Sequence, residues 1–328
     1  MNKVTIQDVA DAVGVSKATI SRFLNGQRGR MSKETHDKIQ NTIETMGYIP
    51  SQQARALKSK HSNLIGLVVA DIGNLYTSFL IKGIQMVLGP QDYQLLISDA
   101  ANDPKIEQDA LERFISQNVD GIILQPQSNQ SSSYGFVDQK RIPMVLVDRK
   151  TTPLQWSMVA SDDYAASVRL ANKLVESGYQ RFVVVSNPVA GKSTRELRLK
   201  AFQSVADKNK VELKLIEVDI EDSAVEGLID YLKSSQQKTV IFATNGRVLN
   251  NCVAYLKENK IEIPTQVGIV GYDDSNMGML IDPPLSTIDQ HPKMIGQQVG
   301  KLILEQLKDK KEPNIQEVKS DIVVRKSF

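Results

Sequence analysis

The sequence predicts a two-part protein. A small helical domain lies at the N-terminus, and a larger α/β body of parallel, doubly wound sheets follows it along the chain. Two observations carry this prediction. From about residue 62 onward, short apolar runs alternate with amphipathic spans, as in repeated βαβ units whose sheets are covered by helices on both faces. Before that point the chain shows only short helical spans separated by glycines, and its charge differs from that of the rest.

Charge is divided unevenly along the chain. Lys and Arg total 40 and Asp and Glu 38, a formal net charge of +2. Residues 1–60 hold ten Lys and Arg against five Asp and Glu, so this segment is basic and the remainder is slightly acidic. Such an asymmetry points weakly to a nucleic-acid-binding module joined to a body with another task.

Composition argues against several other classes of protein. With 41% hydrophobic and 24% charged residues, the chain has ordinary globular composition. The single cysteine, Cys252, cannot form an internal disulfide, and no histidine has metal-ligand spacing, so we expect no metal and no cofactor. No stretch approaches the ~20 apolar residues of a transmembrane helix, and no signal-peptide pattern follows Met1. We therefore expect a cytoplasmic protein without a membrane partner.

Three short helices are expected in the first 47 residues. Each begins after a side chain that can cap a helix and stops at a glycine, the usual C-terminal breaker. The capping residues are Thr5, Ser16 and Ser32, and the glycines are Gly14, Gly26 and Gly47. Asp8, three residues after Thr5, completes the spacing of a capping box.

The second of these helices, residues 17–25, has two faces. Ile20, Phe23 and Leu24 form an apolar stripe, and a polar side lies opposite. That side consists of Lys17, Ala18, Ser21 and Arg22. Two short helices joined by a tight turn form a helix-turn-helix, whose second helix enters the major groove of DNA. On periodicity alone, a small packing module with a solvated basic face explains the segment equally well.

Particular residue runs favour DNA binding. They are VTIQDVA at 4–10, GVSKATISR at 14–22, LNG at 24–26, GYIP at 47–50 and ARAL at 54–57. Together these runs resemble the head of the lactose/galactose repressor (LacI/GalR) family of bacterial transcriptional regulators. The match is long and specific, so it outweighs the packing-module interpretation.

The resemblance implies DNA-binding roles for individual residues. Arg22 can donate to a guanine edge, and Lys17 and Ala18 lie where members of the family vary their base preference. Lys17 could instead contact a phosphate, and Ala18 offers only a methyl group. Hydroxyl and amide side chains suit phosphate oxygens, which position the domain without reading sequence. These side chains are Thr5, Ser16, Thr19, Ser21 and Asn25.

Residues 50–59 are either a flexible linker or a helix that forms on DNA. The segment is too short to hold a helix alone in water, where lengths below ~12 residues are marginal. The resemblance implies a hinge helix that pairs with its dimer mate in the minor groove, with Ala54 and Leu57 at the DNA and Leu57 as the wedge between bases. Folding on binding would make DNA affinity depend on how far apart the body holds the two hinges.

Nine apolar runs in the body are expected strands. They are residues 64–70, 93–98, 120–124, 142–147, 158–160, 181–185, 212–218, 239–243 and 267–270. Helices are expected over 77–89, 105–117, 164–177, 195–209, 223–234 and 247–259. Nine strands are better divided between two sheets than placed in one, and a single closed barrel is the alternative. Polar residues just after several runs favour open sheets, which bind ligands at the carboxyl ends of their strands.

The body resembles the same family, and also the periplasmic sugar-binding proteins that share its fold. The matching runs are LIG at 64–66, VDGIIL at 119–124, VDR at 147–149, VGYDD at 270–274 and PLSTI at 284–288. The resemblance implies a two-lobe, periplasmic-binding-protein-like body around a cleft. The expected parts are a DNA-binding domain at 1–49, a hinge and linker at 50–61, an N-terminal lobe at 62–160 plus about 292–320, and a C-terminal lobe at 161–291 plus about 321–328.

In that cleft the resemblance implies a bound carbohydrate effector. Asp148, Asn245, Asp273 and Gln290 would hydrogen-bond it, Tyr76 would stack on it, and either Arg195 or Arg198 would reach it. The sequence departs from the family at three places, where Gly246-Arg247 follows Asn245, Asp163 replaces a frequent asparagine, and Lys192 precedes Arg195. These charges are either solvated loop residues or signs of an anionic effector, such as a sugar acid or sugar phosphate, clamped by Arg149, Arg195, Arg198 or Arg247.

These patterns predict a homodimeric, effector-responsive regulator on a palindromic operator in double-stranded DNA, most simply a repressor of carbohydrate-use genes. No heptad pattern follows the body, so a dimer is expected. A sugar-binding protein without a regulatory role and a sugar-processing enzyme are the alternatives. GKST at 191–194 looks like the end of a P-loop, but Ser186 stands where its first glycine is required. No nucleophile, base and orienting group occur together, so we expect no catalysis.

Overall fold

The computed structural model describes residues 4–24, 26, 31–49, 61–219, 225, 227–273, 277–309 and 312–328. Its contacts divide the chain into two compact units, Met1–Ser62 and Asn63–Phe328. The predicted hinge helix with Ala54 and Leu57, and the predicted phosphate ligand Asn25, lie outside the described residues.

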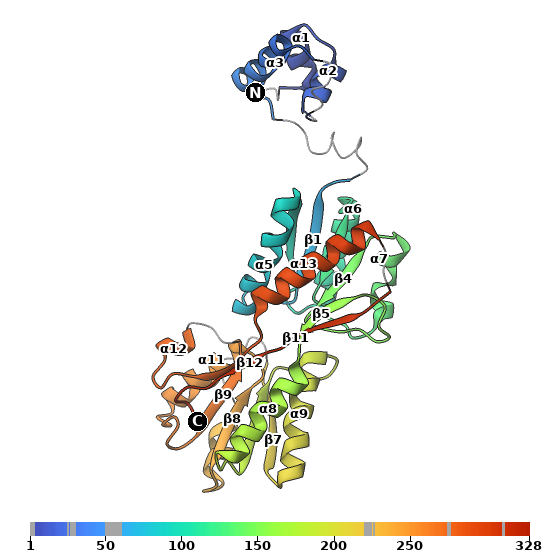
Figure 1. Ribbon diagram of the computed structural model, residues 1–328. Coiled ribbons are helices and arrows are strands. Elements are labelled where there is room, and N and C mark those ends of the chain that lie inside the picture. Colours follow the sequence, from blue (N-terminus) through green and yellow to red (C-terminus); the bar gives the residue numbers. More distant parts are fainter. Residues whose placement is uncertain are drawn as a thin grey trace. The chain divides into compact units, whose positions relative to one another are not determined.

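The described residues of the first unit form three helices around a small apolar core (Figure 1). The helices are α1 (Ile6–Val13), α2 (Lys17–Leu24) and α3 (Lys33–Met46). Thr5 and Asp8 form the expected capping box, and Ser32 caps α3 by accepting from the backbone N–H of Thr35. Gly14 and Gly47 end α1 and α3 at φ angles of 80° and 61°, which favour glycine because it lacks a Cβ. The core consists of Val9, Ala10, Val13, Ile20 and Ile39.

The N-terminal lobe of the body is built on a six-stranded parallel sheet of order β11-β5-β4-β3-β1-β2. The strands are β1 (Leu64–Val69), β2 (Gln94–Asp99), β3 (Gly121–Leu124), β4 (Met144–Val147), β5 (Met158–Ser161) and β11 (Ile315–Val318). One face packs on α5 (Leu75–Leu88) and α13 (Pro292–Lys308). The other packs on α6 (Pro104–Ser116) and α7 (Gly135–Gln139). Short 3-10 turns lie at Gly89–Gln91 and Ser131–Tyr134.

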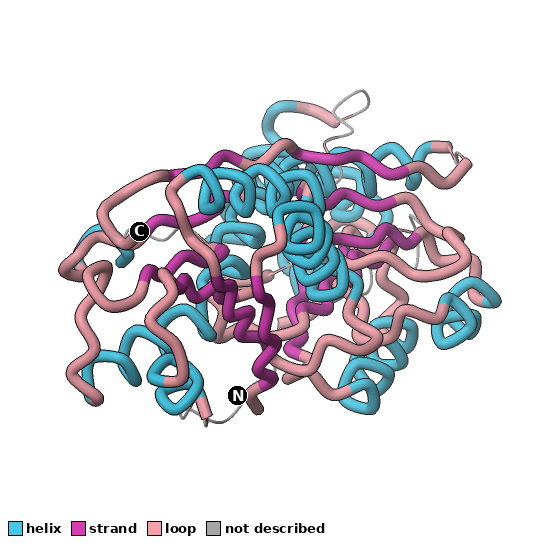
Figure 2. The backbone as a smooth tube through the Cα atoms, turned by 90° about the horizontal axis from the view of Figure 1, so that it is seen from below, coloured by secondary structure: helices cyan, strands magenta, loops and turns pink. Residues whose placement is uncertain are grey.

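The C-terminal lobe has a second six-stranded sheet, of order β12-β10-β9-β8-β6-β7. The strands are β6 (Arg181–Ser186), β7 (Glu212–Glu217), β8 (Thr239–Ala243), β9 (Gly268–Tyr272), β10 (Ser286–Asp289) and β12 (Asp321–Val323). On one face lie α8 (Asp163–Glu176) and α9 (Ser193–Asn209). On the other lie α10 (Leu228–Lys233) and α11 (Gly246–Glu258), and α12 (Met277–Leu280) follows β9. Helices therefore lie on both sides of the strands (Figure 2).

The chain passes between the two lobes at three places. It crosses from β5 to α8, returns from β10 to α13, and crosses again from β11 to β12. A polar contact holds two of these crossings together, because Asp162 accepts a hydrogen bond from the backbone N–H of Ser320, at 2.7 Å. Three short connections of this kind let two rigid lobes rotate about one narrow region.

Two open six-stranded sheets confirm the predicted fold class and exclude the single barrel. The strands are parallel except at one edge of the second sheet, where β12 pairs antiparallel with β10. Strands β10, β11 and β12 and helix α13 were not among the predicted elements. Ser286 and Thr287 of β10 are buried hydroxyl residues, and β12 spans only three residues, so no apolar run marks either strand. None of the described helices is long and apolar enough to cross a membrane.

Candidate functional site

Helix α2 presents the predicted DNA-reading face to solvent. Ile20 is buried in the core of the first unit, whereas Lys17, Ala18 and Arg22 on the opposite side are exposed. Ser21 is half-buried at the edge of that face. These exposed side chains are therefore accessible to DNA, whose major groove is wide enough to admit a helix.

Two of the predicted phosphate ligands, Thr5 and Ser16, also cap the helices α1 and α2. The hydroxyl of Thr5 accepts from the backbone N–H of Asp8 at 3.3 Å, and that of Ser16 accepts from the N–H of Thr19 at 3.2 Å. The hydroxyl groups of Ser16 and Thr19 lie 3.0 Å apart. These residues thus stand at the helix starts, where backbone N–H groups also suit phosphate oxygens.

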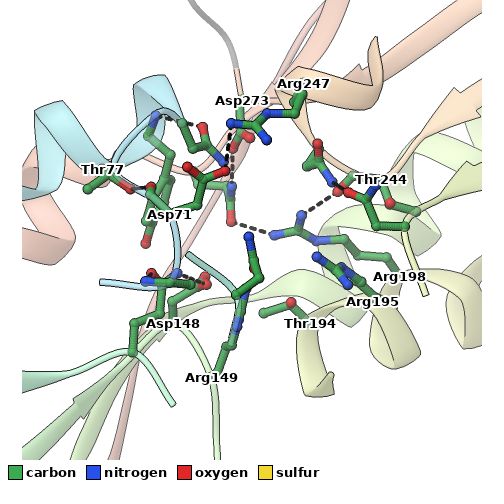
Figure 3. A pocket seen from close by; sticks show the side chains of 18 residues that line it. Asp71, Thr77, Asp148, Arg149, Thr194, Arg195, Arg198, Thr244, Arg247 and Asp273 are labelled. Carbon is green, nitrogen blue, oxygen red and sulfur yellow. Dashed lines mark hydrogen bonds and ion pairs between the residues drawn. The ribbon is translucent and has the colours of Figure 1, made fainter. Parts of the chain in front are cut away.

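In the body, one pocket between the two lobes is lined by all nine predicted effector residues (Figure 3). Tyr76, Asp148 and Arg149 come from the N-terminal lobe, and Arg195, Arg198, Asn245, Arg247, Asp273 and Gln290 from elements of the C-terminal lobe. The pocket has further lining residues that the sequence interpretation did not select: Ala70, Asp71, Asn74, Thr77, Asn102, Gln125, Asn187, Thr194 and Thr244. Asp71 and Gln125 are among the polar residues that follow strand ends, so the sequence placed them at the cleft without assigning them to the effector.

Strand ends bring these residues together. Asp148 follows β4 and Asp273 follows β9, which occupy the third position of their respective sheets. Both residues have a φ angle of 66°, in the left-handed region that aspartate tolerates better than most side chains. The two lobes thus present equivalent aspartates, at the carboxyl ends where open α/β sheets bind ligands.

Glutamine side chains orient both aspartates. The Nε2 of Gln125 donates to Oδ2 of Asp148 at 2.7 Å, and the Nε2 of Gln290 donates to Oδ1 of Asp273 at 2.6 Å. The other oxygen of Asp273 accepts from the backbone N–H of Gly246, at 2.9 Å. Burial raises the pKa of Asp273, an effect that the charge of Arg198 opposes. The carboxylates are therefore held at fixed positions facing the pocket.

Arg198 on α9 is the most thoroughly bonded cation of the pocket. Its Nε donates to Oδ1 of Asp163 at 2.8 Å, and its Nη2 donates to Oε1 of Gln290 at 2.7 Å. Its Nη1 donates to the carbonyl of Thr244, and the guanidinium lies 3.6 Å from the ring centroid of Tyr272. Burial raises the pKa of Asp163 to about 6, although Arg198 favours its charged form. Each nitrogen of this guanidinium therefore donates to an acceptor within the pocket wall.

Arg149 and Arg195 have neutral acceptors. Nη1 of Arg149 lies 3.3 Å from the carbonyl of Pro126 and 3.2 Å from Oε1 of Gln127, and its buried Nε has no partner. Nη1 of Arg195 donates to the carbonyl of Pro188 at 2.8 Å. Both arginines are 8% exposed. The sequence could not choose between Arg195 and Arg198, but the structure separates them by their partners.

Asn245 and Tyr76 are built into the pocket in different ways. Asn245 caps α11, because its Oδ1 accepts from the backbone N–H of Val248, and its Nδ2 donates to Oδ1 of Asn187 at 3.0 Å. The ring of Tyr76 belongs to the apolar core beneath the pocket, and its hydroxyl is buried without a partner. Stacking of this ring on an effector stays a prediction.

Several polar contacts join the lobes around the pocket. Nη2 of Arg247 lies 2.8 Å from Oδ2 of Asp71. The Nζ of Lys192 donates to the backbone carbonyl and the Oε1 of Gln127, at 2.6 and 2.8 Å. The backbone N–H of Lys150 donates to the hydroxyl of Ser193, at 3.1 Å. Among the described residues, no cluster of three metal-binding side chains occurs.

Comparison with known proteins covers both units. Residues 5–51 match the family of bacterial regulatory proteins of the lacI type, and residues 171–328 match a periplasmic binding protein-like domain. The chain is 31% identical to the HTH-type transcriptional regulator KdgR of Bacillus subtilis, over 99% of this chain and 97% of that protein. It is 30% identical to the HTH-type transcriptional regulator PtxS of Pseudomonas plecoglossicida, over 99% and 96% of the two chains.

Solved structures share the fold along the whole chain. The lac repressor dimer bound to operator and the anti-inducer ONPF superposes with a TM-score of 0.86, at 21% identity, over 99% of both chains. The transcriptional regulator CelR in complex with cellobiose gives a TM-score of 0.72, at 20% identity, over 99% of this chain and 100% of that one. Identities this low establish the fold and no more.

Proposed function

The chain belongs to the LacI family of bacterial regulatory proteins, and from this membership we propose that it is a DNA-binding transcriptional regulator controlled by a small carbohydrate. Its relatives are transcriptional regulators and not enzymes. One observation carries the proposal: hydrogen-bonding side chains from both lobes line the same pocket, in a body that follows a helix-turn-helix unit. We infer that it acts as a repressor of carbohydrate-use genes, in the cytoplasm where its DNA lies.

The DNA-binding half of the proposal rests on α2. Two copies of the chain, as a homodimer, would set two such helices in successive major grooves of a palindromic operator. Arg22 would read a guanine edge, and the side chains at the starts of α1 and α2 would contact phosphates. A similar protein, the lac repressor, was solved as a dimer on its operator.

The effector half rests on the chemistry of the pocket. Carboxylate, amide and guanidinium groups are the partners that sugar hydroxyls need, and a ligand that touches both lobes favours the closed arrangement. Closure rotates the lobes and changes the spacing of the two hinge segments of a dimer, which shifts the population able to bind DNA. The coupling between the two ligands is typically ~1–3 kcal/mol.

The DNA-binding half is tested with the full chain and a binding sequence selected from random duplexes. We expect a complex that weakens steeply with salt, because phosphate contacts release counterions. Arg22→Ala is expected to lose about 1–3 kcal/mol of preference for the selected sequence while keeping salt-dependent binding to other DNA. Arg113→Ala, at an exposed position on α6, serves as the control. A complex that is absent or insensitive to salt contradicts the proposal.

The effector half is tested by a thermal-shift screen of the full chain against sugars, sugar acids and sugar phosphates. A ligand that binds only the folded protein raises its melting temperature. Compounds that do so are then added to the DNA complex, where we expect a change in affinity. Stabilising compounds that leave DNA binding unchanged would indicate a sugar-binding protein without a regulatory role.

A further inference from the structure

The four arginines that line the pocket fall into two pairs. Arg198 pairs with Asp163, with Nη2 and Oδ1 2.7 Å apart, and Arg247 pairs with Asp71 at 2.8 Å. Neither Arg149 nor Arg195 lies within ion-pair distance of any carboxylate among the residues that the structure describes. Carboxylates of the protein therefore neutralise Arg198 and Arg247, whereas none of the described carboxylates forms an ion pair with Arg149 or Arg195.

Arg149 is held in the N-terminal lobe by weak, neutral contacts. It follows β4, its two acceptors lie at 3.2 Å or more, and its buried Nε has no partner. Burial lowers the pKa of Arg149, although Asp148 and Glu107 favour its charge. An unpartnered N–H of a buried cation carries its full desolvation penalty. A hydrogen-bond acceptor on a bound ligand would offset this penalty at Arg149.

Arg195 approaches the same space from the C-terminal lobe, in the first turn of α9 (Figure 3). Burial, together with the positive charges of Arg149 and Arg198, lowers the pKa of Arg195 to about 10, although Asp148 and Glu217 favour its charge. No side chain caps α9 among the described residues, and Thr194 of its first turn also lines the pocket. A helix start with open N–H groups favours a negative charge nearby.

We propose that Arg149 and Arg195 form a clamp for the carboxylate of a sugar acid, and that Arg198 is a positioning residue for the pocket wall. This inference rests on the proposed carbohydrate effector and specifies that the effector carries a negative charge. Each guanidinium offers parallel N–H donors that match the two oxygens of a carboxylate. Asp148 and Asp273 on the adjoining walls would repel a doubly charged phosphate more than a singly charged carboxylate.

The clamp gives the effector a way to close the lobes. Without a ligand, Arg149 and Arg195 bring like charges together from opposite lobes, which disfavours the closed arrangement. A carboxylate between them replaces that repulsion with attraction to both lobes. A neutral sugar could occupy the same hydrogen-bonding groups, but it would leave the two cations without a counter-charge. Acid and neutral ligands should therefore differ in affinity and in their effect on DNA binding.

The first test is calorimetric titration of the full chain with matched probes. The acids are D-gluconate, D-glucuronate and D-galacturonate, their neutral counterparts are D-glucitol, D-glucose and D-galactose, and D-glucose 6-phosphate represents phosphates. We expect at least one acid to bind about tenfold or more tightly than its counterpart. Binding of no acid, equal binding of acid and counterpart, or tighter binding of the phosphate would overturn the clamp.

Variants assign the preference to the two arginines. Arg149→Gln and Arg195→Gln are each expected to weaken acid binding about 10- to 100-fold and neutral-sugar binding much less. Arg195→Lys, which keeps the charge, should retain part of the preference for the acid. Arg113→Gln, the same change at an exposed arginine of α6, should alter neither. Equal losses for acid and neutral probes would mean that these arginines hold hydroxyl groups only.

A second measurement needs no ligand. Removing an uncompensated charge relieves repulsion, so Arg195→Gln should melt at the wild-type temperature or higher, whereas Arg198→Gln strands the Asp163 carboxylate and should melt lower. A lower melting temperature for Arg195→Gln, equal to that of Arg198→Gln, overturns the division of roles. The DNA titration reports separately on the proposed function, since loss of acid preference with intact salt-dependent DNA binding defeats only the clamp.

Discussion

Single residues around the pocket show how burial sets the behaviour of a charge. Glu107 on α6 is 2% exposed. Its carboxylate accepts from the hydroxyl of Tyr134 at 2.8 Å and from the backbone N–H of Gln127 at 2.7 Å. Burial raises the pKa of Glu107 to about 7, although these two hydrogen bonds favour the charged form. Glu107 thus titrates near neutrality in contact with Gln127, whose side chain accepts hydrogen bonds from Arg149 and Lys192.

The pH dependence of stability should reveal this group. The folded pKa of about 7 exceeds the ordinary value of 4.5, so the contribution of Glu107 is fully present below about pH 4.5 and is lost as pH rises through 7. We expect Glu107→Gln to be more stable than the wild type at pH 8, by up to about 3 kcal/mol, and the difference to vanish near pH 5. Urea unfolding at the two pH values measures it.

The amide that replaces Glu107 has suitable partners. The hydroxyl of Tyr134 lies 3.3 Å from the carbonyl of Ser128, so it can donate there while accepting from the new side-chain N–H. Glu112→Gln, an exposed position on the same helix, is the matched control and should show no such dependence on pH. A stability difference for Glu107→Gln that is the same at pH 5 and pH 8 would refute the assignment.

At the scale of elements, the closest packing in the body is between α5 and α13. Gly83 of α5 and Gly296 of α13 are buried where the two helices cross. A Cβ on Gly83 would collide with the backbone carbonyl of Lys293, and one on Gly296 with that of Leu80. The backbones themselves are in contact, so neither helix can move away to accept a side chain without disturbing the face of the N-terminal sheet.

This contact predicts an exception to helix propensity. Alanine in place of a helical glycine ordinarily stabilises by about 1 kcal/mol. We expect Gly83→Ala and Gly296→Ala instead to destabilise the body by about 1–3 kcal/mol or more, because the added methyl meets a carbonyl. Gly135→Ala at the start of α7 is the control, since nothing lies within 4 Å of its Cβ position. We measure the melting temperatures of the three variants. We expect lower values for Gly83→Ala and Gly296→Ala and an unchanged value for Gly135→Ala.

At the scale of the whole body, polar contacts across the pocket bias the lobes toward closure. The Arg247–Asp71 ion pair is accessible to water, with side chains 36% and 23% exposed. The contacts of Lys192 with Gln127 and of Lys150 with Ser193 lie at other points of the same boundary. Each is worth little singly because water competes for it, so together they leave closure reversible and open to control by a ligand.

Breaking the accessible pair should open the body. We expect Asp71→Asn to shift the equilibrium toward the open form by at most about fivefold, the equivalent of ~1 kcal/mol, with little change in melting temperature. Small-angle scattering should then show a larger radius of gyration, and a ligand from the screen should bind severalfold more weakly. Asp109→Asn on the exposed side of α6 is the control. An unchanged radius and affinity would show that this pair has no part in closure.

Local signals account for the elements that were predictable. Capping side chains and glycines marked α1 and α3, and apolar runs marked the nine strands from β1 to β9, because these signals act within a few residues. Strands β10 and β12 were not predicted, because the buried hydroxyl residues of β10 and the short length of β12 leave no periodic pattern in the sequence. The pocket lining was predictable in part, since parallel strands align their carboxyl ends and the resemblance supplied the remaining positions.

The sequence by itself determined the family, the order of the helices and most strands, and the charged groups available to the pocket. Only the tertiary structure decided which of those charges neutralise one another. Arg198 meets Asp163 and Arg247 meets Asp71 across the fold, whereas Arg149 and Arg195 line the same pocket without an ion pair to any carboxylate that the structure describes. The reason is physical, because an ion pair depends on a separation of a few ångströms that residues distant in the chain acquire only when the lobes fold together.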